Sequence, residues 1–463
     1  MTWANKTAFV LMFGIVAFTT LAYGGVHQPV IVIFYLAVAS LMVLWVVDAV
    51  KSGVVRISPS VLQLPLFAVA IYSLIQILPF GSIADIAGVN GIPRTISVDP
   101  FSTKLTAIQF FALAFFFSAS LVLLDSAARI RRAAMLVTVF GFGFAFFAVL
   151  QSVLSPDRIY GIYETRFAVP FGSFVNRHNF AAFMEMTLSI PLGLLFAGAV
   201  TRDKRLLYVT AIALMGAALL LSGSRGGLVA FISQLILLVI LTLGSRTKRN
   251  IVLRLGLAIA LIAAITGGAF FVGGDTSLTR IAETSASKDL TTDRLHIWGV
   301  AIRVIGAHMP FGAGFGAFGV AYTAFDSYSG LERVEQAHND YLQVVADGGI
   351  IGFLIGVGFL WLVIRTGLRS SQIDITYRRG IAIGAFSGIS ALLVHSIFDF
   401  VLHTTAVALL FLLLLTLLIA AGFSYKDDVE DATDRHRRMR RTPRRSLDDL
   451  QKPTIAEFKR VHE

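Results

Sequence analysis

The sequence contains no cysteine. Disulfide bonds, thiol nucleophiles and zinc or iron–sulfur sites with cysteine ligands are therefore excluded. No internal repeat is seen in the sequence either.

Charged residues are scarce as well. They make up only 14% of the 463 residues, whereas 56% are hydrophobic and the mean hydropathy is +0.77. A soluble domain cannot bury that much apolar surface, so the composition predicts an all-α, polytopic membrane protein. Twelve apolar runs are long enough to be spans, at 7–23, 29–47, 61–80, 105–124, 133–154, 178–200, 206–222, 227–243, 251–272, 349–366, 380–398 and 406–423.

Lysine and arginine gather in alternate loops between these runs. The basic loops lie at 51–56, 129–132, 202–205, 246–249 and 365–379. Such loops face the cytoplasm by the positive-inside rule. The alternation predicts a multi-pass membrane protein with both termini in the cytoplasm. The net charge of +11 is then a matter of membrane orientation, and binding to nucleic acid is not expected.

The segment 426–463 is polar and carries seven arginines between Arg435 and Arg445. We expect it to be a disordered cytoplasmic tail. Its arginines are suited to anionic lipid headgroups, and a docking arm for a cytoplasmic partner is the alternative. We favour the contact with membrane lipids.

The segment 273–348 is the longest connection expected on the periplasmic side. Loops of this length are either functional or disordered, and its composition favours an ordered segment. An amphipathic helix is predicted, starting at a cap provided by Thr292 or Asp293 and ending before Pro310. Its apolar face would comprise Leu295, Trp298, Ile302 and Ile305. Such a helix would lie on the membrane or cover a cavity.

Two arginines on the expected outer side are candidates for binding an anion. Arg225 lies between two spans among small residues, and Arg294 opens the amphipathic helix. Arg225 is unusual for the outer rim because basic residues collect on the cytoplasmic side, whereas the position of Arg294 by itself favours a solvated residue at the start of a helix. A guanidinium group binds phosphate through two parallel hydrogen bonds. Because the outer segments have no Asp-x-Asp pair to hold Mg²⁺, we expect metal-independent chemistry on a diphosphate.

His338 stands before Asn339 and Asp340 at the start of a span. A histidine can remove a proton at neutral pH, so it is a candidate general base. On its own, however, a single histidine in a loop is more often a polar surface residue.

His395, Asp399 and His403 are spaced four residues apart. On a continuous helix they would share one face and could bind a metal. We favour a polar cap at the outer end of a span, because no fourth ligand is apparent. Asn176 is expected to cap the span that begins near His178.

These segments, in this order, resemble the O-antigen ligase and polysaccharide polymerase superfamily. The resemblance extends from about Phe171 to Phe411. Its motifs are Ser224-Arg225-Gly226, Arg294 to Trp298 with Pro310-Phe-Gly-Ala-Gly314, His338-Asn-Asp-Tyr-Leu342 with Gly348-Gly349, Gly172 to Asn179, and His395 to Asp399. It implies three parts: N-terminal helices at 1–170, a ligase-like core at 171–425 containing the loop 273–348, and the tail at 426–463.

The resemblance implies a glycosyltransferase without a cofactor. Its donor would be a saccharide carried on undecaprenyl diphosphate, and its acceptor a hydroxyl of lipid A core or of a growing polysaccharide. Arg225 and Arg294 would stabilise the leaving diphosphate, and His338 would deprotonate or orient the acceptor. A single displacement would invert the anomeric carbon. The expected substrate-binding residues are Asn339, Asp340, Trp298, Arg303, Asn176, Arg177, Asn179, His395 and Asp399.

A secondary transporter or flippase with twelve spans is the alternative from another class. Such transporters usually have related halves and polar residues at mid-membrane. In this sequence the polar residues collect at the outer rim, and the large loop has no counterpart in the first half. The enzyme is therefore favoured, and both the ligase and the polymerase reaction remain open.

Overall fold

The computed structural model describes residues 2–81, 93–165, 168–242, 289–327 and 334–423, together with Gly256 and Ile259. The chain divides into two compact units, Met1–Gly422 and Phe423–Glu463. The expected span at 251–272, apart from Gly256 and Ile259, and the arginine-rich tail lie outside the described residues. The first unit holds every element discussed below.

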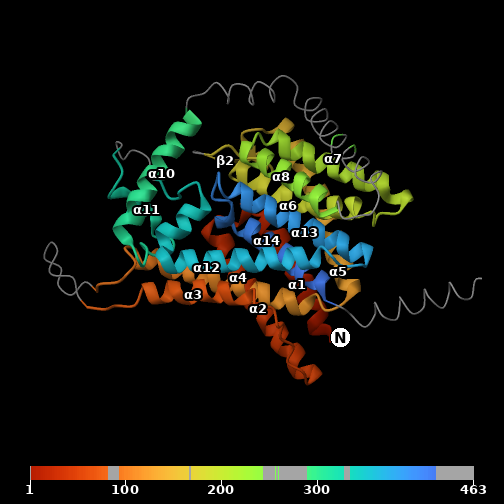
Figure 1. Cartoon of the computed structure of the whole chain (residues 1–463), viewed down its shortest axis with the longest axis horizontal. Helices are drawn as coiled ribbons and strands as arrows, with labels where there is room; N and C mark the ends of the chain where they lie inside the picture. Colours follow the sequence, from red (N-terminus) through yellow and green to blue (C-terminus); the bar gives the residue numbers. More distant parts are fainter. Residues whose placement is uncertain are drawn as a thin grey trace, which may run out of the picture. The chain divides into compact units, whose positions relative to one another are not determined.

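The described residues are almost entirely helical (Figure 1). The helices are α1 (Trp3–Leu21), α2 (Gln28–Ser52), α3 (Gln63–Gln76), α4 (Pro100–Leu123), α5 (Ala127–Leu154), α6 (Arg177–Phe196), α7 (Arg205–Leu221), α8 (Arg225–Thr242), α10 (Asp289–His308), α11 (Phe318–Thr323), α12 (Asp340–Ser370), α13 (Thr376–His395) and α14 (Thr405–Gly422). The short strands β1 (Arg158–Ile159) and β2 (Tyr163–Glu164) form one antiparallel hairpin. The predicted all-α class is confirmed for this part of the chain.

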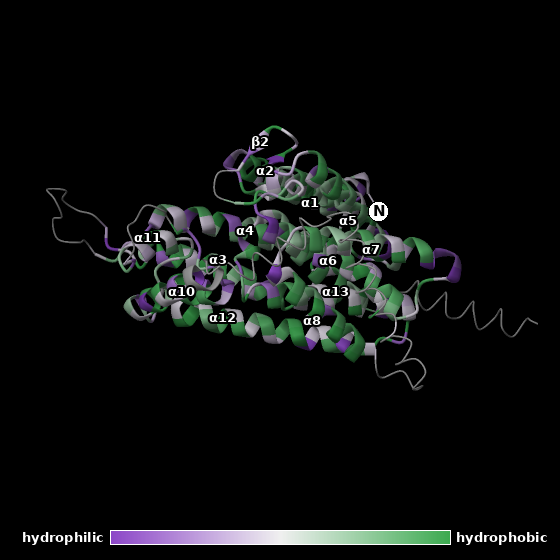
Figure 2. Ribbon diagram, turned by 90° about the horizontal axis from the view of Figure 1, so that it is seen from above, coloured by the Kyte–Doolittle hydropathy of each residue, from purple (hydrophilic) through white to green (hydrophobic). Residues whose placement is uncertain are grey.

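Nine of the described helices are long and apolar enough to cross a membrane: α1, α2, α4, α5, α6, α7 with the preceding turn, α8, α12 and α14. Figure 2 shows α8 and α12 coloured mostly as hydrophobic. Helix α3 is apolar but shorter, and α13 is not among the nine. The expected count of twelve spans therefore stays a prediction, with nine supported by described helices.

Helices α6, α13 and α14 form the centre of the unit. Helix α13 packs against α6, α8 and α14, and nearly every residue of α6 and α14 is buried (Figure 1). Small residues allow the closest approach: a Cβ on Gly193 of α6 would lie 2.4 Å from the carbonyl oxygen of Gly380 on α13. Because α13 is surrounded by other helices, it need not be as apolar as a helix that faces lipid.

Local sequence signals explain several helix starts. Asp99 accepts a hydrogen bond from the Ser102 amide, with Pro100 in the first turn of α4. Ser126 caps α5 in the same way, and Asn176 caps α6 as predicted. These side chains satisfy backbone N–H groups that have no partner within the helix.

Helix α12 is interrupted at Gly349, which has φ +58° and ψ −148°. The loop that follows α10 packs into this interruption: the Ile350 amide donates to the Pro310 carbonyl at 2.9 Å, and the Gly314 amide donates to the Asp347 carbonyl at 3.0 Å. A Cβ on Gly349 would lie 2.2 Å from the Pro310 oxygen. The glycines of both motifs are therefore needed for close backbone contact.

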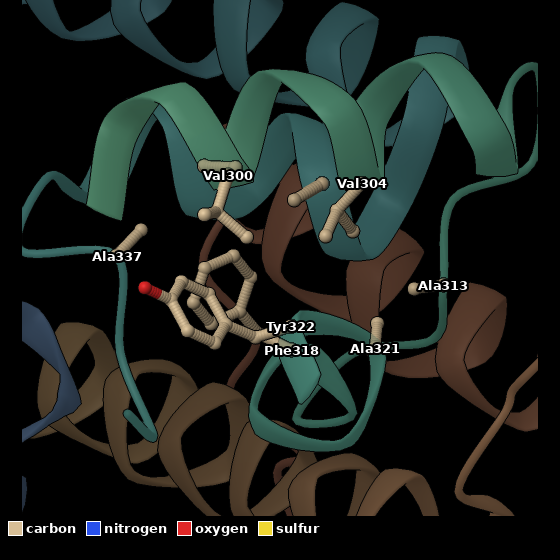
Figure 3. Packing of buried hydrophobic residues seen from close by; sticks show 9 residues of the cluster. Val300, Val304, Ala313, Phe318, Ala321, Tyr322 and Ala337 are labelled. Atoms are coloured by element: carbon tan, nitrogen blue, oxygen red, sulfur yellow. The ribbon is translucent and has the colours of Figure 1, made fainter. Parts of the chain in front are cut away.

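A second apolar core lies where α10 and α11 meet the start of α12. Figure 3 shows Val300 and Val304 of α10 facing Phe318 and Tyr322 of α11. Ala337 belongs to the same buried cluster. This packing fixes the backbone immediately before His338, so the core connects the long loop to the candidate site.

The predicted apolar face of α10 is partly wrong. Leu295 and Ile302 are exposed, whereas Val300, Ala301 and Val304 are buried against α11 and α12. The helix also starts at Asp289, before the proposed caps at Thr292 and Asp293. The correction has a physical reason: α10 carries apolar residues on two sides, and tertiary packing decided which side became core.

Candidate functional site

The carboxylate of Asp399 joins two elements of the site. Its Oδ1 lies 3.1 Å from Nδ1 of His338, and its Oδ2 lies 3.3 Å from Nη2 of Arg294. The Phe400 amide donates to Oδ1 at 2.9 Å. Only 2% of the Asp399 side chain is exposed, so these donors replace water around the carboxylate.

Burial alone would raise the pKa of the Asp399 carboxyl. The hydrogen bond from His338 and the nearby His178 and Arg294 instead hold this pKa below its usual value of 3.8. The group is therefore ionised at neutral pH and can only accept hydrogen bonds. The His338 imidazole must then donate from Nδ1, which leaves Nε2 as its basic nitrogen.

Asp399 is positioned by the end of α13. Helix α13 stops at His395, and a 3-10 turn at Val401–His403 leads into α14. Because the helix does not continue to Asp399, the condition under which His395, Asp399 and His403 would share one helical face is not met. Their side chains have separate partners: His395 contacts Glu185, Asp399 contacts His338, and His403 contacts Asp340.

His338 is held by its backbone neighbours. Trp298 of α10 donates from Nε1 to the Ala337 carbonyl at 3.1 Å, and the Ala337 amide donates to Oε1 of Gln343 at 2.7 Å. His338 itself has φ +49°, a left-handed conformation that is strained for a residue with a Cβ. The centroid of its ring lies 4.8 Å from that of the Phe400 ring, and 31% of the His338 side chain remains exposed.

The predicted substrate-binding residues Asn339 and Asp340 have internal partners. The Asn339 side chain accepts hydrogen bonds from the amides of Tyr341 and Leu342, so it caps α12. Oδ1 of Asp340 lies 3.0 Å from Nδ1 of His403. Both side chains therefore orient the turn that presents His338.

Arg294 and Arg303 take different positions on α10. Nine residues correspond to 2.5 turns of helix, so the two arginines point in opposite directions. Arg294 reaches Asp399, whereas Arg303 is exposed and has no hydrogen bond or ion pair with any residue that the structure describes. The structure does not bring Arg303 to the site.

The start of α6 contributes His178, which the sequence analysis did not select. Its Nδ1 lies 2.9 Å from Oγ of Ser224 and 3.9 Å from Oδ2 of Asp399. Arg177 extends toward the same turn, since a Cβ on Gly223 would lie 3.4 Å from its Nη1. Asn179 is buried, and its Oδ1 has no hydrogen-bond partner among the residues described.

Arg225 is the first residue of α8 and follows the buried Ser224. Its side chain is exposed and forms no hydrogen bond or ion pair within the described part of the chain. A positive charge at a helix N-terminus beside free backbone amides suits an anion. His178 contacts both Ser224 and Asp399, so the turn at Ser224 lies close to Asp399.

Glu185 is the second site residue that the sequence analysis missed. It is fully buried in α6, and both of its carboxylate oxygens lie 3.3 Å from Nδ1 of His395. A carboxylate inside an apolar span is costly without a partner, and that signal was available in the sequence. The identity of its partner was not, because the two residues are 210 positions apart.

No three histidine, aspartate or glutamate side chains lie together with the arrangement of a metal site in the described ranges. The groups that converge are the ionised carboxylate of Asp399, the partly exposed imidazole of His338 and the guanidinium of Arg294. This combination can deprotonate a hydroxyl and stabilise negative charge on a leaving group.

Comparison with known families gives one match. Residues 210–357 match the O-Antigen ligase family. The match includes Arg225, Arg294 and His338, whereas Asn176 and Asp399 lie outside it. No curated protein matches the chain. With its apolar helices and this match, the chain is a membrane protein that carries an O-antigen ligase domain.

Proposed function

We propose that this protein transfers a saccharide from undecaprenyl diphosphate to a hydroxyl of an acceptor glycan. The reaction takes place on the periplasmic face of the bacterial inner membrane. The observation that carries the proposal is the convergence of His338 and Arg294 on Asp399, from segments 44 positions apart that both belong to the matched family region.

His338 acts as the general base in this proposal. Asp399 accepts a hydrogen bond from the Nδ1–H group of His338, which orients the ring. Nε2 is then free to take the proton of the acceptor hydroxyl. The ionised carboxylate then stabilises the imidazolium that forms. The attacking oxygen forms a bond to the anomeric carbon as the bond to the diphosphate breaks.

Arg294 and Arg225 stabilise the departing diphosphate. Arg294 uses one nitrogen for Asp399, and its other N–H donors remain for a phosphate oxygen. Arg225 supplies a second guanidinium from the start of α8. Positive groups held in place before the reaction stabilise the charge that develops on the leaving group.

The position of these residues suits a donor with a lipid anchor. Arg225 begins α8, His338 precedes α12 and Asp399 follows α13, so all three lie at ends of apolar helices. A diphosphate at that level would leave its isoprenoid chain in the bilayer and its sugar outside. Such an arrangement fits a lipid-linked saccharide better than a water-soluble sugar nucleotide.

The proposal is tested with purified protein, a saccharide on undecaprenyl diphosphate, and two acceptors in separate reactions. Lipid A core tests ligation, and a second lipid-linked saccharide tests polymerisation. Transfer in either reaction, unchanged by EDTA and reduced about 10²- to 10⁴-fold in His338→Gln, supports the proposal. No transfer to either acceptor, or full activity of His338→Gln, contradicts it.

The orientation is tested separately. Because the chain has no cysteine, single replacements can be labelled with a membrane-impermeant maleimide. Tyr163→Cys and Thr323→Cys should react in intact spheroplasts, whereas Ser52→Cys and Lys204→Cys should react only after permeabilisation. The opposite pattern would place the site in the cytoplasm and exclude a periplasmic transfer.

A further inference from the structure

The pair formed by Glu185 and His395 is not used by the proposed chemistry. Both side chains are fully buried, at the interface between α6 and α13. Neither residue forms a hydrogen bond with Asp399, His338 or Arg294, so the pair does not act directly on the reacting groups. A buried carboxylate hydrogen-bonded to a histidine is weak support for stability and therefore calls for another explanation.

The pair connects to the Arg225 turn through Ser224. Nε2 of His395 lies 3.5 Å from Oγ of Ser224, and the Gly227 amide donates to the same oxygen at 3.2 Å. The imidazole also packs on the turn itself, since a Cβ on Gly226 would lie 2.9 Å from its Cδ2. His395 thus contacts the residues on both sides of Arg225.

The hydrogen-bond directions are consistent along this path. The Glu185 carboxylate accepts a hydrogen bond from the Nδ1–H group of His395. Nε2 of His395 therefore carries no proton and accepts a hydrogen bond from the Ser224 hydroxyl. The Ser224 oxygen can then accept from the Gly227 amide and from Nδ1 of His178. One carboxylate therefore determines which tautomer each imidazole adopts.

We propose that Glu185 is a positioning residue for the diphosphate site. Acting through His395 and Ser224, it fixes the turn that carries Arg225 and the His178 ring beside Asp399. The inference rests on the proposed function, because it concerns how Arg225 is held for a diphosphate.

The set Glu185, His395 and Ser224 also has the order of groups found in nucleophilic serine sites. Two observations argue against a nucleophilic Ser224. Its side chain belongs to a residue only 4% exposed, and its oxygen is already engaged by the Gly227 amide and the His178 ring. Burial and these two partners favour a positioning role for Ser224.

The experiment measures both turnover and binding of undecaprenyl diphosphate to protein in nanodiscs. Glu185→Leu should weaken both, by up to about 10²-fold in turnover, because a displaced guanidinium no longer faces the diphosphate. Glu185→Gln should keep most of the turnover and of the diphosphate binding, since its amide oxygen can still accept a hydrogen bond from His395. Ser224→Ala provides a second, smaller disruption of the same path and should show the same defect.

Gln234→Leu is the matched control. Gln234 is fully buried in α8, and its side chain donates to the Glu185 backbone carbonyl at 3.0 Å without touching His395. It should lower thermal stability without changing diphosphate binding. If Gln234→Leu and Glu185→Leu reduce binding equally, the pair only holds helices together and the inference is wrong.

A double-mutant cycle locates the effect. In an Arg225→Ala background, Glu185→Leu should add little to the loss of diphosphate binding, whereas in an Arg294→Ala background its effect should persist. Full additivity with Arg225→Ala contradicts the inference, as does a covalent saccharide adduct on Ser224. Wild-type protein that neither binds undecaprenyl diphosphate nor transfers a saccharide would instead contradict the proposed function.

Discussion

Oδ1 of Asp399 lies 3.1 Å from Nδ1 of His338, although 61 positions separate the two residues in the sequence. The contact pairs a buried carboxylate with a partly exposed imidazole. It determines which imidazole nitrogen can accept a proton.

Asp399→Asn should reduce saccharide transfer by about 10²- to 10⁴-fold, because an amide has only one acceptor oxygen for His338 and Arg294 and carries no charge to stabilise the protonated imidazole. The measurement is turnover of purified protein with saturating donor. Asp326→Asn is the control, since Asp326 also pairs with a histidine, His296 at 2.9 Å, but does so away from Asp399. Equal losses in both variants would remove the special role of Asp399.

Arg294→Lys should reduce turnover by at least about 10-fold, because an ammonium cannot serve Asp399 and a phosphate with a planar fork of donors. Arg303→Lys, on the opposite side of the same helix, should leave turnover unchanged. Both variants keep the positive charge of α10, so a difference between their turnover values shows that the position of the guanidinium on the helix matters. A larger loss in Arg303→Lys would show that the diphosphate binds on the other side of α10.

Asp399 should also make stability depend on pH in the acid range. Its pKa is lower in the folded protein than its usual value of 3.8, so ionised Asp399 stabilises the fold above that value. This contribution is lost as the pH falls below about 4. The difference in unfolding temperature between wild type and Asp399→Asn should therefore be constant near neutral pH and shrink in acid. A difference that grows in acid would reverse the assigned sign.

Gly384→Val should destabilise the junction of α6 and α13. A Cβ at this position would lie 2.6 Å from the Ser189 carbonyl oxygen, which belongs to helix backbone and cannot move aside easily. Overpacking of this kind costs about 1–3 kcal/mol or more in the free energy of unfolding. Thermal unfolding in detergent measures the effect, with Gly358→Val as the control, since a Cβ there meets nothing within 4 Å. Equal unfolding temperatures for the two variants would contradict the close packing.

Much of the helical architecture was predictable from hydropathy. Nine of the twelve expected runs coincide with described helices that can span a membrane. The cap at Asn176 was likewise readable, since an asparagine before an apolar run satisfies the first free amides. The face of α10 was not, because a helix that is apolar on two sides gives no unique answer until its neighbours are in place.

The candidate site was predictable in part. Arg294, His338 and Asp399 stood out from their residue types and from the resemblance, and the structure brings them together. His178 and Glu185 were missed. His178 lay between residues that were selected, and Glu185 was overlooked although a carboxylate within an apolar run is a signal in itself.

The sequence by itself determined the membrane class, most of the spans and the set of groups able to act on a diphosphate, because hydropathy and residue chemistry are local properties. Only the tertiary structure decided the partners. Asp399 joins His338 and Arg294, and Glu185 meets His395 across 210 positions, because helices distant in the chain pack side by side. Periodicity along one helix cannot specify which other helix it will contact.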